Sequence, residues 1–223
     1  MWRYTAEERI LRVFNTFYTA HKCDFSAFAD LFIKAYEGGY RRGGPLDARV
    51  VEELAALISE AASASASTLP ELAQLTRELG VRRVYVVDCM GIPEVYALWC
   101  RARGAVRLFV NPSGVTQAFK DAFGASTMAE VAKTLGGAVV KRLDAMAHSD
   151  LFAPQSRAAL AKAIAARMEY AYAHLGQLAE PGSAFISDHG YDVVKAGDKY
   201  AAAHTGLRRP SLAKLATVYV VKF

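Results

Sequence analysis

Short apolar runs separated by helical segments follow Gly80, and this alternation limits the folds that the chain can adopt. Strands that alternate with helices usually pair as parallel neighbours, with helices covering both faces of the sheet. The sequence therefore predicts an α/β fold with a mostly parallel sheet and helices on both faces. The runs are rich in valine and aromatic residues, as strands are, and cover residues 81–88, 105–110, 137–144, 183–188 and 216–223.

Residues 1–80 follow a different pattern. Apolar residues recur at three- and four-residue spacing through most of residues 8–66, with a glycine-rich break at residues 37–45. This spacing predicts amphipathic helices. We therefore expect a helical N-terminal region over residues 1–80, followed by an α/β metal-binding domain over residues 81–223.

The composition sets broad limits. The chain has 223 residues, of which 53% are hydrophobic and 22% charged, as in a globular protein with a sizeable core. Three cysteines without a CxxC pair predict no disulfide framework and a reducing, cytoplasmic location. We expect no signal peptide and no membrane span, because no stretch approaches roughly 18 uninterrupted apolar residues. The net charge of +5 is compatible with a polyanionic partner, but equally with a simple role in solubility.

Aspartates end three of the predicted strands, and histidines follow nearby. In open parallel sheets, ligands bind beyond the carboxyl ends of the strands. Carboxylates and imidazoles together suit zinc or manganese. A single aspartate after a strand is more often a helix cap or a turn residue, but the repetition favours a metal site. The candidate ligands are Asp88, Asp144, His148, Asp188, His189 and His204.

The order of these residues resembles that of the alkaline phosphatase superfamily, which includes phosphatases, sulfatases, phosphomutases and nucleotide phosphodiesterases. The stretches "FVNPSGVTQAF" and "FISDHGYDVVKAGDKYAAAHTGLRRPSLAKLATVYVVKF" are most similar to the PglZ domain. The resemblance covers residues 81–223 and implies an alkaline phosphatase-like core that hydrolyses an ester. Many superfamily members have glycine directly after the first aspartate, where this chain has Cys89.

The resemblance also implies two divalent metal ions, zinc or alternatively manganese. It assigns one ion to Asp144, His148 and His204, and the other to Asp88, Asp188 and His189 together with a nucleophilic hydroxyl. That hydroxyl is expected at the start of the helix after the second strand.

Two hydroxyls near this helix start could be the nucleophile. Thr116 directly precedes the helical run "QAFKDAF", so its oxygen can project from the helix start toward the metals. We therefore favour Thr116, with Ser113 as the alternative. Either hydroxyl could instead cap the helix.

Cations near the last histidine are candidates for binding the substrate. Lys199, Arg208 and Arg209 flank His204 and could hold the non-bridging oxygens of a phosphate ester. Each could equally be a solvated surface charge.

These observations predict a metal-dependent phosphodiesterase that acts on nucleotides or oligonucleotides. A sulfatase is disfavoured, because "NPSGVT" lacks the C/S-x-P-S-R motif of that class. One alternative is a phosphomonoesterase. Another is a non-catalytic regulatory or phage-defence module, in which the helical region binds a protein partner or forms a homodimer. Phe28, Phe32 and Tyr36 could form such a surface, although aromatic residues at this spacing more often belong to a core.

Overall fold

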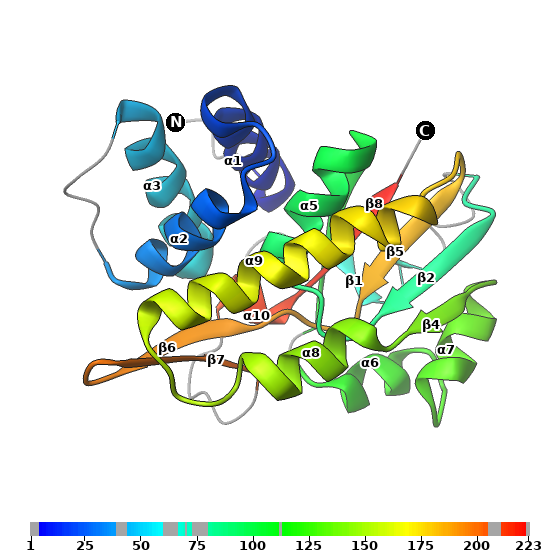
Figure 1. Cartoon of the computed structure of the whole chain (residues 1–223). Helices are drawn as coiled ribbons and strands as arrows, with labels where there is room; N and C mark the ends of the chain where they lie inside the picture. Colours follow the sequence, from blue (N-terminus) through cyan, green and yellow to red (C-terminus); the bar gives the residue numbers. More distant parts are fainter. Residues whose placement is uncertain are drawn as a thin grey trace.

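The computed structural model describes residues 5–38, 44–59, 67–69, 71–72, 80–111, 113–204 and 211–221, and confirms the α/β class (Figure 1). The helices are α1 (Ala6–His21), α2 (Phe25–Tyr36), α3 (Pro45–Ser59), α5 (Ile92–Ala102), α6 (Thr116–Ala122), α7 (Met128–Thr134), α8 (Arg142–Asp150), α9 (Arg157–Ala173) and α10 (Leu212–Leu215), with a 3-10 turn η1 (Leu175–Gln177). The strands are β1 (Ser67–Thr68), β2 (Arg83–Val87), β3 (Ala105–Val110), β4 (Ala138–Val140), β5 (Ser183–Ser187), β6 (Asp192–Ala196), β7 (Lys199–Ala203) and β8 (Ala216–Val221).

Within the described residues, six strands form one sheet in the order β1-β3-β8-β5-β2-β4. Strand β2 pairs in parallel with β5 and β4, and β1 pairs in parallel with β3. Strand β8 runs antiparallel to its neighbours β3 and β5. Strands β3, β5, β2 and β4 therefore point in one direction, and their carboxyl ends lie at one edge of the sheet. Strands β6 and β7 form a separate antiparallel hairpin.

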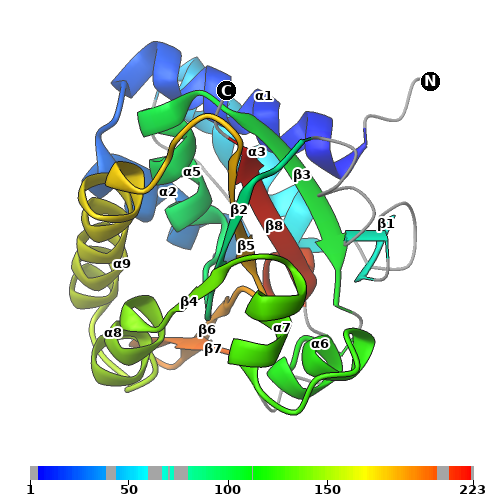
Figure 2. The ribbon, with the colours of Figure 1, turned by 90° about the vertical axis from the view of Figure 1, so that its right-hand side faces the viewer.

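Both faces of the sheet are buried, which explains why the strands are continuously apolar. Successive side chains of a strand point to opposite faces. Tyr85 and Val87 accordingly pack in a core with helices α1, α2, α3, α5 and α9, whereas Val84 and Val86 pack with α6 and α7. Figure 2 shows these two groups of helices on either side of the strands.

Helices α1, α2 and α3 share the larger core with the α/β part of the chain. The Phe28 ring stacks on Tyr96 of α5, with ring centroids 4.4 Å apart, and Phe14 lies 5.1 Å from the same ring. Phe28 and Phe32 are both 0% exposed, so they are core residues and not a partner surface. None of the helices in the described ranges is long and apolar enough to cross a membrane.

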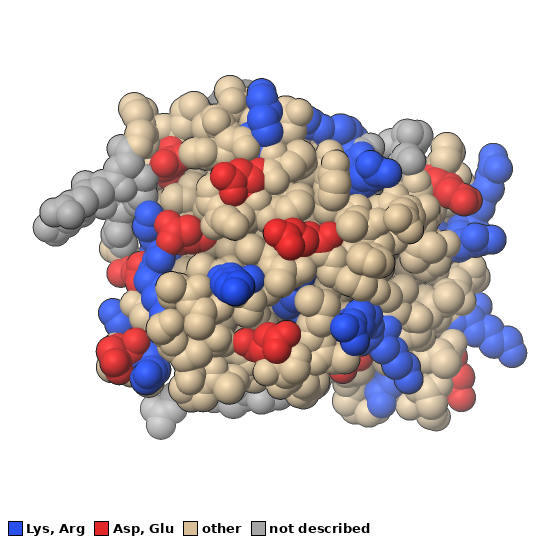
Figure 3. All heavy atoms as spheres, viewed as in Figure 1, with Lys and Arg blue, Asp and Glu red and all other residues tan. Residues whose placement is uncertain are grey.

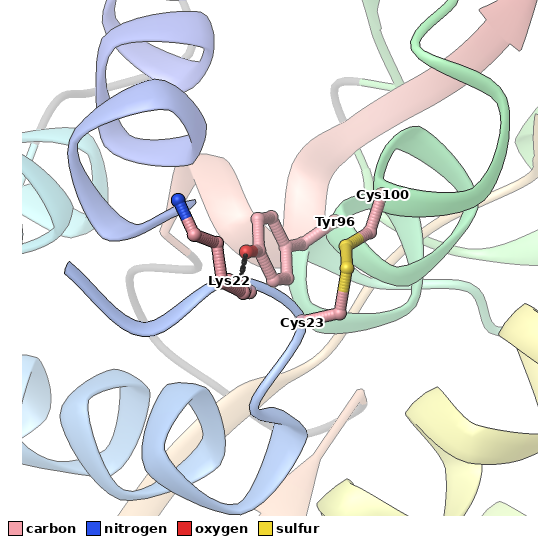
Figure 4. Close-up of a disulfide and its surroundings, with 4 residues drawn as sticks. All are labelled: Lys22, Cys23, Tyr96 and Cys100. Carbon is pink, nitrogen blue, oxygen red and sulfur yellow. Dashed lines mark hydrogen bonds between the residues drawn. A yellow bond between two sulfur atoms is a disulfide. The ribbon is translucent and has the colours of Figure 1, made fainter. Parts of the chain in front are cut away.

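A disulfide joins the helical region to α5 (Figure 4). Cys23, in the turn between α1 and α2, bonds to Cys100 near the end of α5, and Cys89 is a free, buried thiol. Beside this bond the Tyr96 hydroxyl donates to the Lys22 carbonyl. The prediction of no disulfide is therefore wrong. The two cysteines are 77 residues apart in sequence, and only the packing of α5 against the α1–α2 turn brings them together.

The third predicted strand is shorter than its sequence pattern implies. Strand β4 ends at Val140 and α8 begins at Arg142, so Asp144 lies in the first turn of a helix and not at a strand end. Leu143 and Ala147, four residues apart, are both buried and define the inner face of α8. The β6–β7 hairpin is absent from the sequence prediction.

Removing the disulfide should destabilise the protein. We expect Cys23→Ser to lower the free energy of unfolding by about 2–4 kcal/mol, because the cross-link restricts the unfolded chain over a long loop. Urea unfolding with and without a reductant measures this effect, and reduction should abolish the difference between variant and wild type. Under denaturing conditions without a reductant, the wild type should expose one thiol, that of Cys89. Three reactive thiols before reduction would contradict the pairing.

Candidate metal centre

Strands β2 and β5 bring two aspartates together at the carboxyl edge of the sheet. The strands pair in parallel with Val87 opposite Ser187, so the next residues, Asp88 and Asp188, leave the sheet side by side. One ligand atom from each aspartate and one from His189 all lie within 4.8 Å of one another. Asp188 and His189 are buried, and Asp88 is half-buried. We call Asp88, Asp188 and His189 the inner ligand set.

Hydrogen bonds from two backbone N–H groups and a hydroxyl help to hold the Asp188 carboxylate. Its Oδ1 accepts from the backbone N–H groups of Cys89 and His189, at 3.2 Å and 3.0 Å. Its Oδ2 accepts from the hydroxyl of Thr116, the first residue of α6, at 2.6 Å. Thr116 thus touches the inner ligand set directly.

Asn111 fixes the loop that precedes α6, and the sequence analysis did not identify it. Its buried Nδ2 donates to the Asp188 carbonyl at 2.9 Å and to the Val115 carbonyl at 3.0 Å. The hydroxyl of Ser113, which is exposed, donates to Asn111 Oδ1 at 3.2 Å. Of the two candidate nucleophiles, Thr116 is therefore the one that contacts the ligand set. In the sequence, the signal that could have identified Asn111 is its position as a polar residue directly after strand β3.

The inner ligand set concentrates negative charge. Burial, the charge of Asp188 and then that of Asp144 raise the pKa of Asp88 from 3.8 to about 7, against the opposing effect of Lys141. Two neighbouring carboxylates cannot both ionise at low cost unless a cation lies between them. Asp88 and Asp188 therefore either share a proton or bind a cation between them.

The backbone fixes the orientation of the His189 ring. Nδ1 lies 2.8 Å from the Gly190 carbonyl oxygen, which only accepts hydrogen bonds, so Nδ1 is the protonated nitrogen. In the neutral ring this leaves the lone pair on Nε2, which lies 3.5 Å from Asp188 Oδ2. A carbonyl that fixes the tautomer in this way is typical of histidines that bind metal ions.

A second group of predicted ligands, the outer ligand set, lies beside the first. It consists of Asp144, His148 and His204. Asp144 and His148 lie one turn apart on α8, with His148 Nε2 3.4 Å from Asp144 Oδ1. His204 follows β7, and its ring centroid lies 5.6 Å from that of His148 and 5.3 Å from that of His189. His204 therefore bridges the two sets.

His204 is held in the neutral form. Burial, followed by the neighbouring His189 and His148 rings, lowers its pKa to about 4, and Asp144 opposes this shift. Among the described residues, its buried Nδ1 has no hydrogen-bond partner. Neutral imidazole is the form that binds a metal ion.

The residues present fit divalent metal ions. Clustered carboxylates, a histidine with its tautomer fixed and a neutral histidine with an unsatisfied buried nitrogen are a donor set for zinc or manganese. The inner ligand set would hold one ion, close to the Thr116 hydroxyl. The outer ligand set is more open, since the His148 side chain is 61% exposed, and among the described residues only the inner set brings three ligand atoms within 4.8 Å of one another.

Close backbone approaches shape the loops around the inner ligand set. Cys89 adopts φ 60°, a left-handed conformation that favours glycine. Its thiol is buried, and burial raises the thiol pKa, so Cys89 is not a reactive nucleophile. A Cβ at Gly190 would lie 2.0 Å from the Ala213 carbonyl oxygen. Glycine is therefore required directly after His189.

The predicted substrate-binding cations are only partly placed. Lys199 is exposed at the start of β7, and Arg208 and Arg209 lie outside the described residues. A lysine that the sequence analysis missed, Lys214 of α10, is only 3% exposed. The Lys214 carbonyl accepts from Gly190 N–H at 3.0 Å, which places α10 directly against the inner ligand set.

Comparison of the chain with protein-family models, with curated proteins and with solved structures finds no match. The resemblance to the PglZ domain rests on the quoted motifs alone.

The raised pKa of Asp88 predicts how stability depends on pH without metal. Between about pH 4 and pH 7 the folded state retains a proton that the unfolded state has lost, so stability falls as the pH rises through this range. With EDTA at pH 8, Asp88→Asn should therefore unfold at a higher temperature than the wild type, and at pH 4 the gain should disappear. Adding zinc at pH 8 should reverse the order, because only the wild type has the full inner ligand set.

The exposed Asp198, in the turn between β6 and β7, provides the matched control Asp198→Asn, which should follow the wild type throughout. Thermal unfolding monitored by circular dichroism measures all three proteins. A wild type that is more stable than Asp88→Asn in EDTA at pH 8 would contradict the assignment of Asp88.

Proposed function

We propose that the chain is a metal-dependent phosphoesterase, specifically a phosphodiesterase acting on nucleotides or oligonucleotides. Thr116 is the nucleophile, and the two ligand sets hold two divalent ions, zinc or manganese. The main support is the 2.6 Å hydrogen bond from the Thr116 hydroxyl to Asp188 Oδ2. Thr116 is the first residue of α6, its hydroxyl does not cap the helix, and it points instead to a carboxylate of the inner ligand set.

The arrangement of ligands supports the same class of chemistry. Both ligand sets adjoin the same edge of the sheet. Ions bound there could contact one phosphate ester from two sides. The PglZ resemblance of residues 81–223 and an alkaline phosphatase-like core belong to this proposal. Bound divalent ions would neutralise the phosphoryl charge and make a nearby hydroxyl more acidic.

The residues of the chain account for two displacement steps. The Thr116 oxygen forms a bond to phosphorus while the bond from phosphorus to the leaving oxygen breaks. Asp188 Oδ2, which already accepts the hydroxyl hydrogen bond, takes the proton, and the leaving oxygen on the opposite side of phosphorus takes a proton from solvent. Water then forms a bond to phosphorus and gives up a proton to solvent, while the bond from phosphorus to the Thr116 oxygen breaks. Asp188 returns its proton to that oxygen, which restores the hydroxyl and releases the phosphate monoester.

Lys214 is a better candidate than Lys199 for holding a non-bridging oxygen. Its side chain is buried, its charge contributes to the lowered pKa of His204, and it forms no ion pair within the described residues. Burial lowers the pKa of Lys214, with Asp192 opposing the shift. A buried ammonium without an ion pair gains more from an incoming anion than an exposed one does.

The surface charge bears on the size of the substrate. On the face seen in Figure 3, Lys and Arg side chains are interspersed with Asp and Glu and do not form a basic stripe. This face therefore lacks the continuous basic surface that a long duplex would need. The cytoplasmic location stays a proposal, and the Cys23–Cys100 bond argues against it because disulfides are rare in reducing compartments. In the thiol count described above, one reactive thiol would oppose this location and three would support it.

Metal content and hydrolysis together test the proposed function. The purified wild type should contain zinc or manganese near two equivalents and should cleave bis(p-nitrophenyl) phosphate faster than p-nitrophenyl phosphate. Thr116→Val should lower kcat by more than about 100-fold, while Asp88, Asp188 and His189 remain to hold the inner ion. Ser113→Ala is the matched control and should retain wild-type activity.

Mass spectrometry after an acid quench should detect phosphorylated Thr116 in the wild type. Faster cleavage of the monoester would identify a phosphomonoesterase. Absence of both metal and hydrolysis, even after reconstitution, would reject the enzyme and leave the non-catalytic regulatory module.

Lys214→Met should lower kcat/KM for the diester by about 10- to 100-fold, because the phosphoryl oxygens lose a buried positive charge. Lys199→Met removes an exposed lysine and should change kcat/KM less than twofold. Steady-state kinetics of both variants, with metal content measured in parallel, makes the comparison. Equal effects of the two substitutions would contradict the assignment of Lys214.

A further inference from the structure

Arg167 is a fully buried arginine on α9, a helix that supplies none of the predicted metal ligands. Its guanidinium donates in three directions. Nε donates to Glu94 Oε1 at 2.7 Å, Nη2 donates to the Cys89 carbonyl at 2.6 Å, and Nη1 donates to the Leu143 carbonyl. One rigid, planar group therefore joins three separate segments of the chain.

The two carbonyls belong to the segments that present the two ligand sets. Cys89 directly follows Asp88 of the inner ligand set. Leu143 directly precedes Asp144 of the outer ligand set. Because the peptide unit is planar, a hydrogen bond to the Leu143 carbonyl also restricts the backbone at Asp144. The Arg167 guanidinium thus binds one backbone carbonyl next to a member of each ligand set.

Glu94 extends this connection to the segment after β5. Its Oε2 accepts from Gly91 N–H at 2.9 Å, and its Oε1 accepts from the Tyr191 hydroxyl at 3.1 Å. Tyr191 is fully buried and lies two residues after His189. Glu94 itself is 0% exposed, at the start of α5.

A purely stabilising role does not explain this choice of residues. Burying an ion pair costs desolvation energy, and apolar residues of similar volume often stabilise a core equally well. The arginine fork offers what apolar residues lack, namely several donors at fixed separations. Here its hydrogen bonds to the backbone both go to residues adjacent to predicted metal ligands.

We propose that Arg167, held in place by Glu94, is a positioning residue that sets the separation of the two ligand sets and hence of the two ions. This inference rests on the proposed two-metal centre. Arg167 touches neither substrate nor metal. It acts by holding the Cys89 and Leu143 carbonyls at a fixed distance from each other.

The experiment compares Arg167→Lys with the wild type, both loaded with manganese. Lysine keeps the charge but loses the fork, so it cannot bind both carbonyls and Glu94 in the same geometry. Calorimetric titration should show two ions in the wild type and at least one ion bound about 10- to 100-fold more weakly in the variant. Electron paramagnetic resonance should show a coupled Mn(II) pair in the wild type and altered coupling in the variant. With the diester, kcat should fall by a similar factor and KM should stay nearly constant.

Arg157→Lys is the matched control on the same helix. Arg157 binds Asp30 and Glu37, outside both ligand sets, so its substitution should leave metal affinity and coupling unchanged. If Arg167→Lys fails to fold, the double variant Arg167→Met/Glu94→Met provides a second test. It removes both charges together, should remain folded, and should still show weakened binding of the ions.

The outcomes separate this inference from the proposed function. A folded Arg167→Lys protein, or a folded double variant, with wild-type affinities and wild-type coupling would overturn the positioning role. A wild type that binds two coupled ions but hydrolyses neither ester would refute the proposed phosphodiesterase, while altered coupling in the variant would still support the positioning role. A wild type that binds no ion pair would overturn both.

Discussion

The parallel, in-register pairing of β2 with β5 places two carboxylates side by side at a buried edge of the sheet. With Val87 opposite Ser187, the backbone has no freedom to separate Asp88 from Asp188. Two neighbouring negative charges that are shielded from water repel each other, and hydrogen bonds from the surrounding groups reduce this unfavourable energy. Backbone N–H groups and a hydroxyl bond to Asp188. A nearby guanidinium binds the loop that follows Asp88.

The parts of the fold that depend on local pattern could be predicted from the sequence. Strands β2, β3 and β5 are continuous apolar runs because both faces of the sheet are covered, and their ends are marked by polar residues. The proximity of Asp88 to Asp188 and of Asp144 to His148 could be predicted, because the first pair follows the ends of two strands and the second lies one turn apart on a helix. Thr116 could be favoured because it stands at a helix start. Asp144 was identified as a ligand candidate although its element was misassigned, since the i, i+4 spacing to His148 holds on a helix.

The remaining features depend on contacts between distant segments, for which a single sequence has no local signal. Arg167 and Glu94 are 73 residues apart, and the arginine appears in the sequence as one more charge on a helix. Lys214 looks like a surface residue until α10 packs against Gly190. The Cys23–Cys100 bond follows from how α5 meets the α1–α2 turn. In each case the partner is set by tertiary packing, and spacing along the chain does not reveal it.

The position of β8 has a consequence for how the protein matures on the ribosome. This strand follows all the others of its sheet in sequence, yet it lies between β3 and β5. Until it inserts, the β1–β3 pair and the β5–β2–β4 group share no backbone hydrogen bonds of the sheet. Thr116 follows β3 and Asp188 follows β5, so the hydroxyl meets its carboxylate only after β8 closes the gap. A nascent chain that lacks β8 would therefore lack the strand that joins the segment carrying Thr116 to the segment carrying Asp188.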